Sequence, residues 1–189
     1  GYFNGIFPPG KKDPVLAGTV LENMLNAHVE TYHLLKAIPG SEKVKIGLVK
    51  NIFQFDPLRR WHLLDWAFSK ILNDVYTNAP LEFLKTGKSS FYMPGMVDNE
   101  MLNPEAPGTL DFIGLNYYSR MHVKGRLNPE EPFVFDTRQQ DIMTDMGYPL
   151  YAEGFYRALK TISEVDVPIY VTENGLADDK DTVRPLFIE

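Results

Sequence analysis

Short apolar segments that end in polar residues alternate along this chain with longer segments of helical periodicity. The clearest apolar segment, residues 169–171, passes directly into Thr172, Glu173, Asn174 and Gly175. β-Branched and aromatic residues followed by a polar cluster predict a buried strand whose carboxyl end opens into a loop. A second strand is predicted at residues 111–118, where apolar residues lead into an amide and two phenols at positions 116–118.

The rest of the chain shows the same alternation. We expect helices at 15–38, about 58–75 and 152–165, a strand at 44–49, a long loop at 93–108 and an irregular region at 125–149. Such alternation predicts an α/β fold with parallel strands and right-handed crossovers. Because Asn51, Asn116 and Glu173 each follow a predicted strand, we expect them on one face of the sheet.

The residues at these strand ends suit a carbohydrate site. Amides and carboxylates can hydrogen-bond sugar hydroxyls, and aromatic rings can pack against sugar C–H groups. Each residue also has a simpler interpretation. Glu173 could be a solvated loop residue, the tyrosine pair could be ordinary packing, and the Asn116 amide could satisfy loop backbone.

Two sequences, D-F-I-G-L-N-Y-Y at 111–118 and P-I-Y-V-T-E-N-G at 168–175, together resemble glycoside hydrolase family 1, the retaining β-glucosidase family. The resemblance implies that Glu173 is the catalytic nucleophile, that Tyr118 hydrogen-bonds to it, and that Asn116 lines the sugar site. The first ten residues are similar to the loop that follows the family's T-x-N-E-P motif. The resemblance runs from the first residue to the last.

The fold implied by this resemblance is a (β/α)8 TIM barrel, an α/β architecture that needs about 250 residues when complete. We therefore expect residues 1–189 to form a single, incomplete catalytic domain of roughly three consecutive β/α units. The T-x-N-E-P motif, which carries the family's acid/base Glu, does not occur in the sequence, and the family's C-terminal sugar-binding segment is also missing. An internal fragment of this kind should be inactive alone and could self-associate through exposed barrel edges.

In the full-length parent the resemblance implies hydrolysis of β-O-glycosidic bonds in small-sugar or aryl glycosides by a retaining double displacement, without cofactor or metal. Two alternatives stay open. One is a non-catalytic glycan-binding relative, because barrels are reused for other functions. The other is an unrelated barrel enzyme that acts on sugar phosphates. An intact upstream N-E-P motif would favour the enzyme, and a phosphate site after the last strands would favour the second alternative.

Composition narrows the classes of partner. Hydrophobic content of 44% and charged content of 23% are near the globular norm. A net charge of −6 without a long basic run argues against nucleic acid and anionic membrane surfaces, and no apolar stretch approaches the roughly 20 residues that span a bilayer. The absence of cysteine excludes disulfides and thiolate metal sites. No N-x-S/T sequon occurs, which mildly favours a cytoplasmic protein.

The histidines and one acidic run give weaker signals. His28 and His33 lie five positions apart, which does not stack two zinc ligands on one helix face. We expect His62 to be a packed or surface helical residue and His122 to be a loop residue near solvent. The acidic residues at 178–181 lack the spacing and glycine of a calcium loop, so we expect them to cap the next helix.

Overall fold

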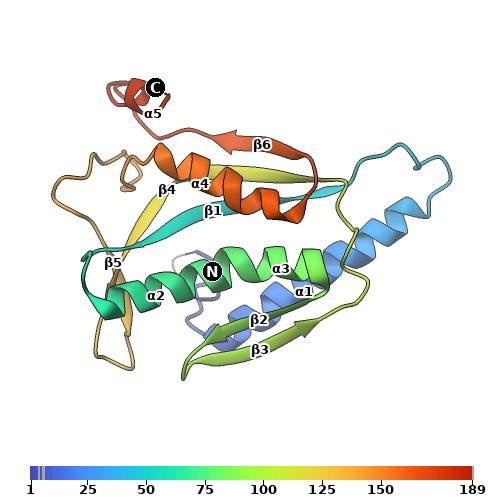
Figure 1. The fold of residues 1–189 in the computed structure, drawn as a ribbon, viewed down its shortest axis with the longest axis horizontal. Helices are drawn as coiled ribbons and strands as arrows, with labels where there is room; N and C mark the ends of the chain where they lie inside the picture. Colours follow the sequence, from blue (N-terminus) through green and yellow to red (C-terminus); the bar gives the residue numbers. More distant parts are fainter. Residues whose placement is uncertain (4, 6, 189) are drawn as a thin grey trace. The chain divides into compact units, whose positions relative to one another are not determined.

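The computed structural model describes residues 1–3, 5 and 7–188. These residues group into two compact units, one formed by Gly1–Leu48 and Asp74–Phe112, the other by Val49–Asn73 and Ile113–Glu189. Figure 1 labels the helices and strands of both. The single catalytic domain expected from the sequence stays a prediction.

The first unit is built around helix α1 (Pro14–Lys36), which confirms the helix expected at 15–38. The helix begins there because the Asp13 side chain accepts a hydrogen bond from the Leu16 backbone N–H at 3.0 Å, and because Pro14 suits the first turn. Its buried face includes Gly18, where an added Cβ would lie 3.1 Å from the Phe91 ring. The glycine therefore allows the helix to approach its neighbour closely.

That neighbour is a β-hairpin, β2 (Lys88–Met93) paired antiparallel with β3 (Val97–Leu102). A π-helical turn, η1 (Asp74–Asn78), and helix α3 (Ala79–Thr86) precede it. The long loop expected at 93–108 is therefore wrong over its first half. Pro94 and Gly95 form the tip of a hairpin, and the strands persist because alternate side chains, including Phe91 and Met101, are buried.

The second unit contains the sheet (Figure 1), with β4 (Phe112–Gly125) at its centre. One edge of β4 pairs with β6 (Ile169–Asn174), which is parallel, and further along with β5 (Phe133–Asp136), which is antiparallel. β1 (Gly47–Pro57) pairs with β4 as well. Val49 lies beside Gly114, and the Leu58 N–H donates to the Val123 carbonyl at 2.9 Å. Residue numbers increase along both strands between these two contacts, so β1 and β4 are parallel.

Four expectations are wrong in this unit. The strands expected at 44–49 and 111–118 continue to Pro57 and Gly125, and the region expected to be irregular contains β5. The extension persists because β5 pairs with the end of β4 and places Phe135 6.0 Å from the Phe55 ring. The helix expected to begin near residue 58 begins later, as α2 (Leu63–Asn73), because the Arg59 N–H is bonded to the Asp65 side chain in a turn.

Helix α4 (Glu153–Ile162) covers β4, with the Phe155 and Tyr117 rings 5.9 Å apart. A short helix, α5 (Arg184–Ile188), follows β6, and the Asp178 carboxylate accepts from the Val183 and Arg184 N–H groups at 2.7 and 3.0 Å. The expected capping role of the acidic run is thus confirmed. Within the described residues the sheet is not a closed barrel, because β6 pairs with β4 alone. None of their helices has the length and apolar character to cross a membrane.

Candidate active site

The structure brings Glu173 and Tyr118 together. Glu173 lies near the carboxyl end of β6 and Tyr118 lies on the adjacent β4, one residue beyond the stretch that pairs with β6. The Tyr118 hydroxyl donates a hydrogen bond to Glu173 Oε2. This bond raises the pKa of the Tyr118 phenol, because loss of its proton would leave two negative oxygens in contact. The expected contact between these two residues is therefore present.

A local irregularity in strand pairing sets the direction of the carboxylate. Leu115 is opposite Val171, but Asn116 is opposite Glu173, so β6 carries one extra residue, Thr172, at this point. The Thr172 hydroxyl donates to Asn116 Oδ1 at 2.6 Å. Bulges of this kind re-aim side chains beside active sites, and here the bulge places Glu173 next to Tyr118.

Asn116 therefore lies directly beside the predicted nucleophile, on the same face of β4 as Tyr118. The Asn116 amide oxygen accepts the hydrogen bond from Thr172, and the N–H groups of the same amide are its donors toward the site. The Asn174 side chain binds the Tyr117 carbonyl at 3.0 Å and ties the end of β6 to β4. A carboxylate, an amide and a phenol thus share one strand end.

The expectation that Asn51 and Asn116 directly follow strands is wrong. Asn51 and Asn116 lie inside strands rather than directly after them. Asn116 is paired with Glu173 across the β4–β6 ladder, and Asn51 lies on β1, the other neighbour of β4. Gly114 allows β4 to pack closely against β1 here, because a Cβ there would lie 2.8 Å from Val49 Cγ2.

Three histidines make contacts with residues other than Glu173, Tyr118 and Asn116. His28 Nε2 is 2.9 Å from the Thr109 carbonyl, and His62 Nδ1 is 3.0 Å from Asp65. His122 contradicts the expectation of a loop residue near solvent, because it lies on β4 with 1% exposure where β5 covers the strand. Burial and the nearby Arg120 and other cations lower its pKa. Among the described residues no cluster of three or more potential ligands could hold a metal ion.

Sequence reasoning missed Thr172 and a polar network just beyond Tyr118. The network is centred on Arg120, which contacts Asp56, Asp141 and the Tyr151 ring. These residues come from β1, β4 and the segment before α4, so no local motif joins them. The one available signal was the presence of Asp56 and Arg120 on strands, since buried charges need partners.

Comparison with known proteins identifies the family of this site. The sequence model of glycosyl hydrolase family 1 matches residues 1–186. Beta-glucosidase A of Thermotoga maritima is 30% identical over 196 residues, and a beta-galactosidase of Pyrococcus woesei is 28% identical over 207 residues. These alignments cover 95% and 96% of this chain but 41% and 40% of the relatives, so the chain spans about two-fifths of their length.

Solved structures of β-glycosidases also resemble this chain. A beta-glycosidase from Pyrococcus horikoshii matches with a TM-score of 0.80 at 31% sequence identity. The match covers 99% of this chain and 42% of the beta-glycosidase chain. A family 1 β-glucosidase from Thermotoga maritima has a TM-score of 0.77 at 25% identity, with coverages of 100% and 46%. The fold is therefore part of a (β/α)8 barrel. The chain belongs to glycosyl hydrolase family 1.

Proposed function

We propose that this chain carries the nucleophile half of a retaining β-glycosidase and that Glu173 is the nucleophile. The observation that supports this most directly is the hydrogen bond from the Tyr118 hydroxyl to Glu173 Oε2. A donor held against the carboxylate fixes its orientation, which a carboxylate nucleophile requires.

In this proposal Glu173 attacks the anomeric carbon of a β-glycoside and forms a covalent glycosyl-enzyme, which water then hydrolyses. Asn116 lies beside Glu173 in the pairing register, and its amide hydrogen-bonds a hydroxyl of the bound sugar. The relatives are named as β-glucosidases and β-galactosidases, which supports a β-linked hexoside as the substrate class. Neither step of this mechanism requires a cofactor.

A retaining enzyme needs a second carboxyl group about 5–5.5 Å from the nucleophile. We propose that a part of the polypeptide outside residues 1–189 supplies it, because the sequence contains no N-E-P motif and covers only two-fifths of its relatives. Without that acid the leaving group departs unprotonated, at a cost of roughly 100- to 10,000-fold in rate. Residues 1–189 alone are therefore inactive in this proposal.

Self-association of the isolated chain follows from the exposed side of β6. In the described sheet β6 pairs with β4 alone, and Tyr170 and Val171 are 58% and 47% exposed. An apolar strand at a sheet edge is a template for pairing with another chain. For the parent enzyme we propose a cytoplasmic location and no nucleic-acid partner, on the basis of a sequence without cysteine or N-x-S/T sequon and a net charge of −6.

The test is covalent trapping in the full-length protein. A 2-fluoro glycoside with an activated leaving group slows both steps through its fluorine, and the leaving group rescues only the first, so the glycosyl-enzyme accumulates. Peptide mapping should place the sugar mass on Glu173. A label on another carboxylate would reassign the nucleophile. Reversible binding without any label would support the glycan-binding alternative.

A further inference from the structure

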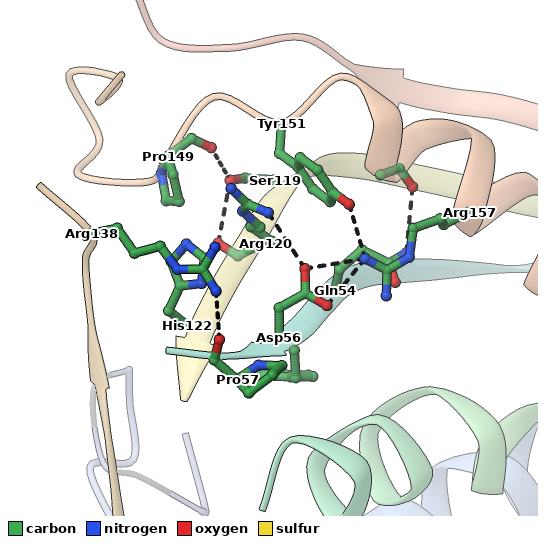
Figure 2. Close-up of polar contacts among 12 residues, drawn as sticks. Gln54, Asp56, Pro57, Ser119, Arg120, His122, Arg138, Pro149, Tyr151 and Arg157 are labelled. Atoms are coloured by element: carbon green, nitrogen blue, oxygen red, sulfur yellow. Dashed lines mark hydrogen bonds and ion pairs between the residues drawn. The ribbon is translucent and has the colours of Figure 1, made fainter. Parts of the chain in front are cut away.

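A network of polar contacts joins β4, just beyond Tyr118, to the segment Arg138–Tyr151, which we call the 138–151 loop (Figure 2). The Ser119 hydroxyl donates to the Pro149 carbonyl, and the Tyr117 hydroxyl donates to the Tyr151 carbonyl at 2.6 Å. Tyr117 is the last residue of β4 paired with β6, and Ser119 lies between that stretch and the stretch paired with β5. The loop therefore attaches to β4 on either side of Tyr118.

Arg120 connects both ends of this loop. Its guanidinium lies 4.0 Å from the centroid of the Tyr151 ring, at the end of the loop, and 3.5 Å from Asp141 near its start. A third contact, at 3.6 Å, reaches Asp56 on β1. The Arg120 side chain is 17% exposed and that of Asp141 is 4% exposed, so these charges interact with little screening by water.

A second arginine leaves Arg120 as the main side-chain cation for Asp141. Arg157 of α4 lies 3.1 Å from both oxygens of Asp56 and donates to the Tyr151 hydroxyl at 3.0 Å. Asp56 and Tyr151 therefore keep a cationic partner when Arg120 is removed. Among the described residues Asp141 then keeps the Arg138 N–H at 2.8 Å and lies 3.1 Å from the buried His122, whose pKa is lowered first by burial.

The loop is also bonded to the segment that follows Glu173. The Asp145 N–H donates to the Ala177 carbonyl at 3.0 Å, and the Asp145 carboxylate accepts from the Asp179 N–H at 2.6 Å. Within the loop, backbone bonds from Leu150 to Ile142 and from Thr144 to Tyr148, at 2.7 and 2.8 Å, fold the segment onto itself. Hydrogen bonds therefore tie the two ends of the loop to each other and to the segment after β6.

We propose that Arg120 is a positioning residue that holds Glu173 against Tyr118 by fixing the 138–151 loop between β4 and the segment after β6. The inference rests on the proposed role of Glu173 as nucleophile. A misplacement of about 1 Å in a reacting group can cost on the order of 100-fold in rate.

The experiment compares Arg120→Met with Arg126→Met in the full-length protein. Arg126 directly follows the same strand but pairs with the exposed Glu131. Arg126→Met therefore removes an arginine without removing a contact of the 138–151 loop. For a 2-fluoro glycoside we expect Arg120→Met to lower the rate constant of inactivation roughly 10- to 100-fold with an unchanged inhibition constant. Arg126→Met should match the wild type in both constants. Loss of stability alone would not separate the two constants in this way.

A second readout does not depend on reaction. In protein labelled with ¹³C at tyrosine Cζ, the pKa of Tyr118 should fall toward its ordinary value in Arg120→Met, because Glu173 moves away. If Arg120→Met does not fold, Tyr151→Leu removes the ring on which Arg120 packs and leaves the carbonyl that Tyr117 uses. The same slowing and the same fall in pKa are expected there.

The outcomes separate the inference from the proposed function. A folded Arg120→Met or Tyr151→Leu protein with wild-type inactivation and an unchanged Tyr118 pKa would overturn the positioning role. A wild-type protein that takes no label would count against Glu173 as nucleophile, and the Tyr118 titration would still decide whether Arg120 holds the two side chains together.

Discussion

The hydroxyl of Tyr118 donates a hydrogen bond to the carboxylate of Glu173, and this contact links β4 to β6 at the carboxyl end of the parallel pair. Ligands of α/β folds bind at this end of the strands. The same hydrogen bond therefore joins the two strands and contacts the proposed nucleophile.

Replacement of Tyr118 by Phe should slow the full-length enzyme without unfolding it. The change removes one hydrogen bond to a charged group, worth about 1.5–3 kcal/mol, which corresponds to roughly 10- to 150-fold in rate. Stopped-assay kinetics on an aryl β-glucoside measure the loss. Tyr156→Phe is the matched control, because Tyr156 is 69% exposed on α4. Equal rates for the two variants would contradict a role for the Tyr118 hydroxyl.

Replacement of Glu173 by Gln should abolish turnover and leave the melting temperature close to that of the wild type, because the amide keeps the shape but cannot attack. It should also lower the pKa of Tyr118, since the raised value comes first from the hydrogen bond to the Glu173 carboxylate. NMR titration of labelled tyrosine checks this. Glu164→Gln, on an exposed turn, should change neither quantity. Retention of most activity in Glu173→Gln would exclude Glu173 as nucleophile.

Asp65 should contribute to acid unfolding. It is fully buried, and although burial raises its pKa, hydrogen bonds from Arg59 and the Gly125 N–H lower the value to about 2. The unfolded value is about 3.9, so the folded state binds fewer protons, and the stabilisation is complete above about pH 4 and lost as pH falls toward 2.

Asp65→Asn should therefore cost about 2 kcal/mol of unfolding free energy at neutral pH. The difference from wild type should shrink in urea melts as the pH is lowered from 5 to about 2. A difference that stays constant with pH would show that Asp65 contributes through packing instead of charge.

Residues 1–189 expressed alone should form oligomers or aggregates and should not hydrolyse an aryl glucoside. Light scattering after gel filtration measures the mass. Val171→Lys places a charge on the exposed side of β6 and should reduce the association, because edge strands with lysine resist pairing. Monodisperse monomers of the unmodified chain would contradict the prediction, and turnover by such monomers would also contradict the need for an outside acid.

Local sequence determined the elements and the two chemical segments. Proline after Asp13 and the helical spacing of apolar residues define α1, and β-branched residues before Glu173 define β6. The polar residues at 116–118 and 173 were recognisable because side-chain chemistry changes abruptly where a strand ends. These features depend on residues that are close together in the sequence, so the sequence alone is enough to predict them.

Tertiary structure decided the direction of the side chains and the length of the strands. The extra residue at Thr172, which turns Glu173 toward Tyr118, exists only in the pairing of β6 with β4. β4 continues to Gly125 because β5 pairs with it, and His122 is buried for the same reason. Arg120 and Asp141 acquire their roles from contacts between segments distant in sequence. Pairing and burial free energies arise only when such segments meet, so local residue patterns do not encode them.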